Sequence, residues 1–325
     1  MTTWLVTGGA GYIGAHVVRA LTTAGMRPVV VDNLSSGRAG FVPDGVDLVE
    51  GDILDTELLT RTLADNRCSG VVHVAGFKYA GVSVERPLHT YAQNVTGTAS
   101  VLAAMEAAGT PGMVFSSSAA VYGTPDGELV TEDSPKRPES PYGESKLIGE
   151  WLIDDVARSR PGFRGASLRY FNVVGSATDE VYDASPHNLF PLVIEALLEG
   201  RTPRINGDDY PTPDGTCVRD YVHVGDLAVS HVAAARALDA GRPLLPAYNL
   251  GSGEGLSVRQ IMDAMRRVTG IDFDPAIAPR RAGDPARIVA TGEAAARDLD
   301  WRMRYSVDEM VASAWSARRS AVPAA

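Results

Sequence analysis

Tyr142 and Lys146 lie four residues apart, directly after the dipeptide Ser140-Pro141. Residues i and i+4 share one face of a helix, and serine followed by proline is typical of an N-cap and the first helical turn. A phenol with a pKa of about 10 is a poor base at neutral pH, but a neighbouring ammonium group favours the phenolate. The spacing therefore predicts a tyrosine that removes a proton with the help of a lysine.

Lysine is rare in this chain. Among 30 basic residues, only Lys78, Lys136 and Lys146 are lysines. A chain that uses arginine almost everywhere is expected to keep lysine where a compact ammonium group with an adjustable pKa is needed. This bias supports a specific task for Lys146 and draws attention to Lys78.

The apolar segment 113–116 predicts a parallel strand that leads into three consecutive serines, Ser116, Ser117 and Ser118. Open parallel sheets bind their ligands at the carboxyl ends of the strands. A serine at this edge can hydrogen-bond a reacting oxygen and pass its proton toward Tyr142. In isolation Ser118 would be read as a turn residue, but beside Tyr142 and Lys146 we interpret it as the third catalytic residue.

Gly8, Gly11 and Gly14 form the pattern G-x-x-G-x-x-G between a predicted strand, 3–7, and a predicted helix, 16–23. Glycines at these positions permit a tight turn, close approach of the backbone to a pyrophosphate, and close packing of helix on strand. The positive end of the helix then faces the phosphate groups. The pattern predicts a dinucleotide site; the alternative is an ordinary glycine-rich turn.

Asp32 supports the dinucleotide interpretation, because it ends the next predicted strand, 28–32, about 20 residues beyond the last glycine. A carboxylate there can bind the ribose hydroxyls of adenosine and would repel a 2′-phosphate, so we expect NAD rather than NADP. The positive nicotinamide ring would also favour the Tyr142 phenolate, and Lys146 can bind the nicotinamide ribose. Asp52 and Ile53 are candidates for an adenine contact, or else belong to an ordinary turn.

The scaffold that positions these residues alternates strands and helices. Further strands are predicted at 46–50, 71–74 and 166–170, and helices at 57–64 and 95–108, which indicates an α/β fold with a doubly wound parallel (Rossmann) sheet. Segment 175–216 is rich in Pro, Asp and Gly and has one apolar helical stretch, 189–198, so we expect a smaller α/β substrate-binding lobe. The expected division is an NAD-binding domain, 1–174 plus about 217–253, and a nucleotide-sugar-binding lobe, 175–216 plus about 254–325.

Composition limits the function further. A net charge of −10 over 325 residues opposes binding to nucleic acid, and an anionic ligand must be held by local arginines or backbone amides. No segment reaches the roughly 18 apolar residues of a membrane helix, and the first residues do not resemble a signal peptide. Cys68 and Cys217 lack zinc-ligand spacing. We therefore expect a soluble cytoplasmic protein with no metal site and no membrane partner.

Together these residues resemble the extended short-chain dehydrogenases, and several longer strings resemble the UDP-glucose 4-epimerases within that group. The similarity spans essentially the whole chain. The glycine string, 7–14, and the Tyr-Lys string, 141–146, are typical of the whole superfamily. The strings 73–78 and 209–224 are closer to the epimerases. The strings are 7–14 (TGGAGYIG), 32–34 (DNL), 73–78 (HVAGFK), 115–119 (FSSSA), 141–146 (PYGESK), 168–172 (LRYFN) and 209–224 (DYPTPDGTCVRDYVHV).

The resemblance implies a reaction at C4 of a UDP-hexose. Tyr142 would remove the proton of the sugar 4-hydroxyl while C4 delivers hydride to NAD, and the resulting 4-keto sugar would swing about its anchored pyrophosphate and take the hydride back on its other face. Ser118 and Lys146 would complete the catalytic set. The resemblance also implies a homodimer, formed through helices that include the Tyr142 segment.

The resemblance assigns further residues to cofactor and substrate. With the residues above, those implied for the cofactor are Gly8, Gly11, Tyr12, Ile13, Gly14, Asp32, Asn33, Asp52, Ile53, Val74, Ala75, Gly76, Lys78, Tyr142, Lys146 and Phe171. Those implied for the UDP-sugar are Lys78, Ser118, Tyr142, Asn172, Asn188, Leu189, Arg204, Ile205, Asn206, Arg219, Arg281 and Asp284. Of these, Asn188, Arg219, Arg281 and Asp284 would hold the UDP, because an arginine fork binds two diphosphate oxygens at once. Residues 204–206 would run alongside the uracil.

Three features depart from the family pattern. Gln93-Asn94-Val95 stands where relatives often have Asn-Asn-Val, and the loop 175–188 is shorter than in typical members. Ile288 stands near Asp284 at a position that carries Tyr or a smaller residue in relatives and is associated with the admission of N-acetylated sugars. The substrate therefore stays open between UDP-glucose or UDP-galactose and the UDP-N-acetylglucosamine, UDP-glucuronate and UDP-xylose types.

Two other functions fit the residues less well. A 4,6-dehydratase on this scaffold would have an acidic pair directly after the catalytic hydroxyl, whereas Ala119 and Ala120 follow Ser118. A non-catalytic NAD-sensing protein of the same fold commonly lacks the catalytic Tyr or Lys, and both Tyr142 and Lys146 are present.

Overall fold

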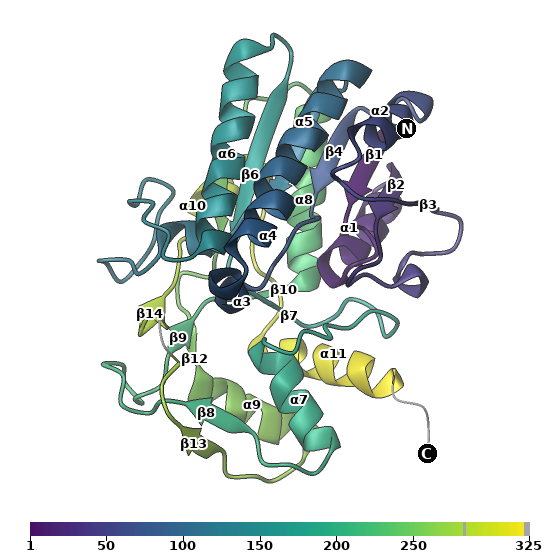
Figure 1. Ribbon diagram of the computed structural model, residues 1–325. Coiled ribbons are helices and arrows are strands. Elements are labelled where there is room, and N and C mark those ends of the chain that lie inside the picture. The colour runs from purple at the N-terminus through teal and green to yellow at the C-terminus, as the bar shows by residue number, and fades with distance from the viewer. Residues whose placement is uncertain (282–283, 322–325) are drawn as a thin grey trace.

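A parallel sheet of seven strands forms the centre of the protein (Figure 1). The computed structural model describes residues 1–281 and 284–321. All neighbouring strands in this sheet run parallel, and the strand order reverses between β1 and β4. The predicted doubly wound α/β fold is confirmed. Across the sheet, the strands are β11 (Ala247–Leu250), β6 (Arg164–Tyr170), β5 (Gly112–Ser116), β4 (Gly70–His73), β1 (Thr3–Thr7), β2 (Arg27–Asp32) and β3 (Asp47–Glu50).

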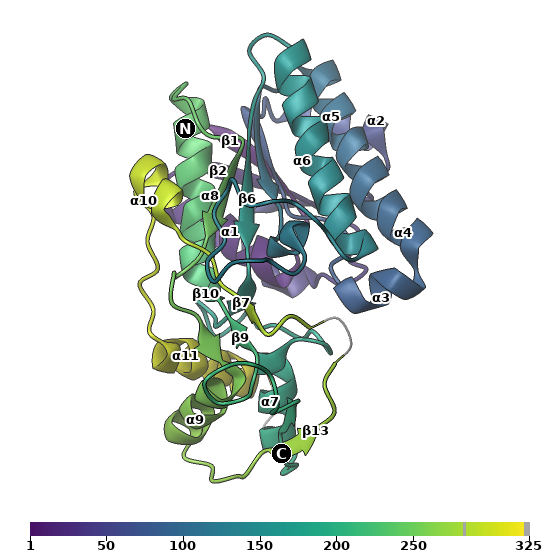
Figure 2. The same ribbon diagram turned by 90° about the vertical axis from the view of Figure 1, so that its left-hand side faces the viewer.

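Helices cover both faces of the sheet (Figure 2). α1 (Tyr12–Thr23) and α8 (Val224–Asp239) lie against one face, and α2 (Thr56–Asp65), α5 (Gly97–Ala108) and α6 (Pro141–Ser159) lie against the other. Successive side chains of a strand point to opposite faces, so Trp4 and Val6 of β1 join the core on the α1 side, whereas Leu5 joins the core on the α5 side. Burial on both faces explains the continuous apolar strands of the sequence.

The predicted elements differ from the observed ones mainly at their ends. α1 begins at Tyr12, one turn before the predicted start, because Gly11 is its N-cap. The helix predicted at 95–108 continues a π-helical segment, η2 (Ala92–Thr96). No strand is predicted from the sequence at β11, and its four residues are held in the sheet by pairing with β6. Other connecting elements are η1 (Ala39–Phe41), α3 (Ala80–Glu85), α4 (Pro87–Tyr91) and η3 (Ala119–Tyr122).

A smaller lobe lies beyond the carboxyl ends of the strands (Figure 1). Its core contains apolar side chains of three helices, among them Ile194, Met265 and Met310. The remaining elements are β7 (Asn172–Val174), α7 (Leu189–Leu198), β8 (Arg204–Asn206), β9 (Val218–Arg219), β10 (Tyr221–His223), β12 (Leu256–Ser257), α9 (Val258–Thr269), β13 (Ala276–Ala278), β14 (Arg287–Ile288), α10 (Glu293–Leu299) and α11 (Val307–Ser320).

The sheet and the smaller lobe have separate hydrophobic cores, which supports a division into two domains. We propose a sheet domain of residues 1–174 and about 217–253 and a lobe formed by most of the remainder. One part of the lobe's expected range packs elsewhere, because Ala294, Ala295 and Leu299 of α10, with Trp301 after it, join the core on the α8 side of the sheet. In the described parts of the chain, no helix combines the length and apolar character that crossing a membrane requires.

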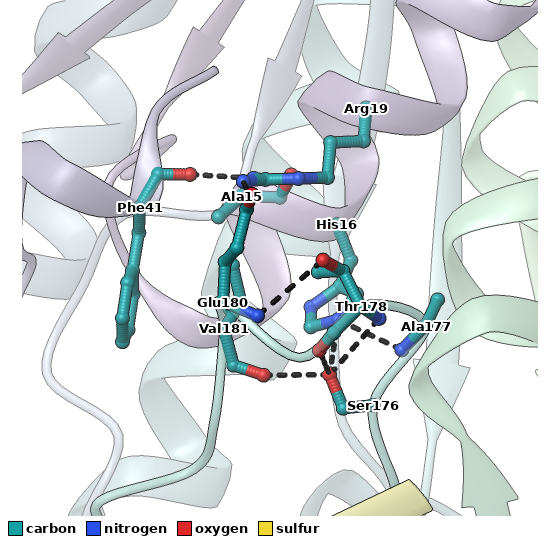
Figure 3. Close-up of polar contacts among 9 residues, drawn as sticks. All are labelled: Ala15, His16, Arg19, Phe41, Ser176, Ala177, Thr178, Glu180 and Val181. Carbon is teal, nitrogen blue, oxygen red and sulfur yellow. Dashed lines mark hydrogen bonds and ion pairs between the residues drawn. The ribbon is translucent and has the colours of Figure 1, made fainter. Parts of the chain in front are cut away.

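The loop that leaves the sheet domain after β7 is fastened to α1 by polar contacts (Figure 3). The backbone N–H of Ala177 donates to Nε2 of His16 at 3.1 Å, so the ring proton lies on Nδ1, which faces the Tyr12 carbonyl oxygen at 2.8 Å. The Ser176 hydroxyl lies 3.1 Å from the same Nε2. Farther along α1, Nη2 of Arg19 pairs with Glu180 at 2.7 Å. The start of this loop is therefore fixed to the helix that opens at the glycine turn.

Acidification should weaken this attachment. Burial keeps His16 neutral and lowers its pKa to about 4, whereas an unfolded histidine has a pKa of about 6.5. The stability that depends on the neutral ring is present above about pH 6.5 and is lost as the pH falls toward 4. From about pH 7.5 to about pH 5, His16 should contribute about 2 kcal/mol to the loss of unfolding free energy.

Urea unfolding of His16→Gln at both pH values should show a pH dependence smaller by this amount. Glu180→Gln is the matched control, because it removes the ion pair with Arg19 from the same loop without touching the His16 ring, and its cost should be similar at both pH values. An unchanged pH dependence in His16→Gln would contradict this role.

Candidate active site

One cavity of about 1160 Å³ is lined by both the sheet domain and the smaller lobe. It contacts the carboxyl ends of β1, β2 and β4, where the strand order reverses, the usual ligand position in a doubly wound sheet. Its volume exceeds the roughly 300–1,000 Å³ of a pocket for one small ligand. The cavity is therefore large enough for a dinucleotide and a second ligand together.

The glycine turn forms the floor of the cavity at the start of α1. Gly8 has a φ of +72° and lies so close to Ala75 that a Cβ on it would come within 2.8 Å of the Ala75 nitrogen. A Cβ on Gly14 would come within 2.0 Å of the Gly8 carbonyl oxygen. Both positions therefore exclude a side chain, and α1 approaches the turn closely enough to present its N-terminus to a phosphate group.

Asp32 and its neighbours form one end of the cavity. One Asp32 carboxylate oxygen accepts a hydrogen bond from the Ala10 nitrogen at 2.9 Å and the other from the Leu34 nitrogen at 2.8 Å. Each oxygen can accept a second bond, which leaves capacity for ribose hydroxyls. Asn33 donates to Asp52 at 2.9 Å and closes the same end. The glycine cradle and this carboxylate fit a dinucleotide without a 2′-phosphate.

Tyr142 and Lys146 lie on the first two turns of α6. Ser140 caps the helix, with its Oγ accepting a hydrogen bond from the Gly143 nitrogen at 3.2 Å, and Pro141 stands at the first helical position, as predicted. Nζ of Lys146 donates to the Ser116 carbonyl oxygen at 2.9 Å and lies 5.9 Å from the centre of the Tyr142 ring. The spacing thus places both side chains against the cavity, with the lysine beside the end of β5.

Burial dominates the titration of this pair. It lowers the pKa of Lys146 to about 8 and raises the pKa of Tyr142 above its ordinary value, although a hydrogen bond with Ser118 acts to lower it. The phenol is therefore protonated at neutral pH in the protein alone. A further positive charge beside the ring would favour the phenolate of Tyr142.

The far end of the cavity is basic, in contrast to the net charge of −10. Arg219 is largely buried, and its Nη2 lies 3.5 Å from Oδ1 of Asp284. Three more arginines, Arg201, Arg204 and Arg281, line the same cavity. Such a cluster can hold a diphosphate, so an anionic nucleotide is attracted locally despite the negative charge of the whole protein.

The predicted residues converge on this cavity with two exceptions. Ser118 is half-buried just after β5 and does not line the cavity; it acts to lower the pKa of Tyr142, and its Oγ accepts from the Ala120 nitrogen at 3.1 Å. Ile205 is buried in the core of the smaller lobe, because alternate residues of β8 face opposite ways, so its side chain makes no part of the cavity wall. All the other predicted cofactor and substrate residues line the cavity.

Comparison with known proteins agrees with this arrangement. The model of the NAD dependent epimerase/dehydratase family matches residues 4–251. The chain belongs to this family. It is 44% identical to the UDP-glucose 4-epimerase of Azospirillum brasilense, over 97% of this chain and 92% of that protein.

Two solved structures of the epimerase/dehydratase family illustrate the similarity of fold. The structure of the Bifidobacterium longum UDP-glucose 4-epimerase in complex with NAD+ and UDP has a TM-score of 0.91 and 35% identity, covering 98% of this chain and 99% of that one. The structure of the Campylobacter jejuni UDP-Glc/GlcNAc 4-epimerase has a TM-score of 0.85 and 33% identity, with the same coverage of 98% and 99%.

A buried ion pair, Glu150–Arg169, joins the segments around Tyr142, Lys146 and Ser118. Glu150, one turn after Lys146 on α6, accepts from Nε of Arg169 at 2.8 Å and from Ser117 Oγ at 2.5 Å. Arg169 also donates to the Tyr122 hydroxyl at 2.7 Å. Since Ser117 precedes Ser118 and Arg169 lies at the end of β6, one carboxylate joins α6, the end of β5 and the end of β6.

Asn94 fixes the loop that follows β4. Its Oδ1 accepts from the Phe77 nitrogen at 2.7 Å, and its Nδ2 donates to the Phe77 carbonyl oxygen at 3.0 Å and to Ser145 Oγ at 2.8 Å. A π-helical segment often marks a functional position, and here η2 aims Asn94 at both the loop and α6. The segment Gln93-Asn94-Val95 departs from the family pattern at Gln93. Asn94 holds the loop that forms the cavity wall, and Gln93 lines the cavity.

Several lining residues were not found by sequence reasoning. Tyr79 could have been predicted, because aromatic residues on both sides of Lys78, a candidate ligand-binding lysine, indicate a cavity wall. His187 directly precedes the predicted Asn188. The residues missed include Tyr79, His89, Asp183, Ser185 and His187.

The close packing at Gly14 can be tested by Gly14→Ala. Because the added methyl group would overlap the Gly8 carbonyl oxygen, the turn must shift, which should cost about 1–3 kcal/mol of unfolding free energy. The shift should also weaken NAD binding about tenfold or more, measured by calorimetry. Gly40→Ala is the control, since a Cβ there meets no atom within 4 Å. Unchanged NAD affinity in Gly14→Ala would contradict the proposed cradle.

Proposed function

We propose that the protein interconverts UDP-galactose and UDP-glucose by inverting C4 of the sugar, with NAD as its cofactor. The observation that carries this proposal is the meeting, in one cavity, of a glycine cradle for a dinucleotide, the Tyr142-Lys146-Ser118 set and an arginine-rich end. A cavity with these three parts can hold a dinucleotide and a nucleotide sugar against the same tyrosine. Near-full-length similarity to UDP-glucose 4-epimerases supports the same conclusion.

The chain's own residues would divide the work as follows. NAD, when bound, accepts the C4 hydrogen with its electron pair and later returns it. Tyr142 removes the proton of the 4-hydroxyl and gives it back, and Ser118 hydrogen-bonds the same oxygen. Lys146 supplies positive charge to the phenol and binds the nicotinamide ribose. Arg219 and Arg281 hold the diphosphate, so the oxidised sugar can turn while its nucleotide stays in place.

UDP-N-acetylglucosamine is a second candidate substrate. Ile288 packs among buried apolar side chains beside Ala119 and Phe171 and does not line the cavity. No bulky ring extends from this position toward the sugar, which favours room for an added acetamido group. We also infer that the protein acts in the cytoplasm, because its two cysteines are buried free thiols, as is usual in a reducing compartment.

The direct test is conversion of UDP-galactose to UDP-glucose by the purified protein, followed by chromatography. The expected result is C4 inversion with NAD, rather than NADP, extracted from the protein. A panel that includes UDP-N-acetylgalactosamine separates the two candidate substrates. Bound NAD without inversion of any UDP-sugar would instead support the non-catalytic NAD-sensing alternative.

The role of Tyr142 predicts the behaviour of Tyr142→Phe. This substitution keeps the ring but removes the group that accepts the proton, so kcat should fall about 100-fold or more while bound NAD is retained. The NAD content of the purified variant serves as its control for folding. Near-normal kcat would show that another group removes the proton.

We propose a homodimer formed by the outer faces of α5 and α6. Trp151 of α6 is 56% exposed, and exposed Ala99, Ala103 and Ala107 form a row of small side chains along α5. Small residues permit close approach of helices, and an exposed tryptophan commonly anchors an interface. Because α6 carries Tyr142, pairing would also stabilise the catalytic helix.

Trp151→Arg should therefore convert the protein to a monomer in sedimentation or light-scattering measurements. The matched control is Leu245→Arg, which places the same charge on an exposed apolar position of the loop before β11 and should leave the oligomeric state unchanged. A dimer that persists in Trp151→Arg would refute this interface.

A further inference from the structure

A row of aromatic rings crosses the cavity from the sheet domain to the smaller lobe. The rings of Phe77 and His89 have their centres 5.2 Å apart, those of Phe77 and Tyr79 5.6 Å, and those of Tyr79 and His187 4.9 Å, and each pair meets edge to face. All four residues line the cavity. The last contact in the row joins the two parts of the protein.

Tyr79 and His187 belong to elements that face each other. Tyr79 is the N-cap residue of α3, which lies at the edge of the sheet domain nearest the smaller lobe (Figure 1). His187 directly precedes Asn188, the N-cap residue of α7 in the smaller lobe. Tyr79 is half-buried and His187 is exposed, so the pair lies where the cavity meets solvent. Its contact therefore closes the cavity between the two lobes at this point.

The pair lies near the reacting end of the cavity. Ser83 of α3 accepts a hydrogen bond from the Tyr142 backbone nitrogen at 3.1 Å, which packs α3 on the first turn of the catalytic helix. Lys78 stands between Phe77 and Tyr79, with its Nζ 5.5 Å from the centre of the Tyr79 ring. The contact thus lies beside the start of the helix that carries Tyr142.

Tyr79 is not a second catalytic base. Burial and the negative charge of Asp183 both raise its pKa, so its phenol stays neutral. Asp183 is itself held in the loop, where its Oδ2 accepts from Asn188 Nδ2 at 2.8 Å. The environment of Tyr79 therefore suits a ring that makes packing contacts rather than one that transfers protons.

We propose that the Tyr79–His187 contact is a closure that keeps the 4-keto sugar in the cavity while it turns, an inference that rests on the proposed function. The turning sugar must leave its contacts with Tyr142 and is then held only through its nucleotide. A single edge-to-face contact shifts an opening equilibrium about two- to tenfold. That is enough to slow escape of the intermediate and too little to trap substrate or product.

Escape of the intermediate has a defined chemical signature. In the first half of the reaction the C4 carbinol becomes a ketone, its hydroxyl proton passes to Tyr142, and NAD becomes NADH. If the ketone leaves before the second half, the protein keeps NADH and cannot begin another cycle. Each escape therefore yields one free 4-keto sugar and one reduced, inactive protein.

The first experiment follows NADH absorbance and free 4-keto sugar during turnover of UDP-galactose. In Tyr79→Ala and in His187→Ala, both should accumulate about two- to tenfold faster per turnover than in the unmodified protein. Tyr79→Phe, which keeps the ring, should behave like the unmodified protein, and the double alanine variant should exceed neither single variant. Accumulation at the unmodified rate in active Tyr79→Ala would overturn the closure.

A second experiment makes the closure testable apart from the reaction. In Tyr142→Phe, whose turnover should be at least about 100-fold slower, adding Tyr79→Ala should speed dissociation of UDP-galactose about two- to tenfold and leave dissociation of UDP unchanged, measured by stopped flow. Equal dissociation of UDP-galactose with and without Tyr79 would refute the closure. Failure of the unmodified protein to invert any UDP-sugar, with this dissociation difference present, would refute only the proposed function.

Discussion

The ion pair between Glu150 and Arg169 is the interaction on which the geometry of the site depends. Both side chains are almost fully buried, at 7% and 5% exposure, and the carboxylate also accepts from Ser117. A buried pair adds little net stability compared with apolar residues, but loss of one partner leaves an uncompensated charge. The pair therefore fixes α6, the end of β5 and the end of β6 relative to one another.

This constraint places the Lys146 ammonium group in an apolar environment. Its Nζ lies 4.9 Å from the centre of the Phe115 ring, and burial lowers its pKa, an effect that the charge of Glu150 partly offsets. The same burial keeps Tyr142 protonated. A positive charge beside the phenol, such as the nicotinamide ring of oxidised NAD would supply, would act against this effect of burial.

The sequence predicted the parts of the site that depend on local spacing. The glycine pattern lies in one turn, Asp32 ends a strand, and Tyr142 and Lys146 lie on consecutive turns of one helix. Each lines the cavity from the element that was predicted for it. Ile205 is the exception in β8, because the alternation of a strand points its side chain into the core of the smaller lobe, opposite to Arg204 and Asn206. The role of Asn94 and the approach of His187 to Tyr79 depend on how loops from distant parts of the chain meet, and a single sequence contains no local signal for that.

The two ends of the cavity differ in a way that suits inversion rather than net oxidation. At one end Arg219, Arg281 and Asp284 offer charged groups that would hold a nucleotide in a fixed position. At the other, the walls near Tyr142 include Phe77, Tyr79 and Phe171, whose rings make few directional bonds. A sugar attached to an anchored diphosphate can therefore change the face it presents without leaving the protein. An enzyme that only oxidises its substrate has no need to let the sugar turn, whereas inversion at C4 requires it. Charged groups that hold the nucleotide, together with rings that make few directional bonds to the sugar, are therefore the arrangement expected of an epimerase.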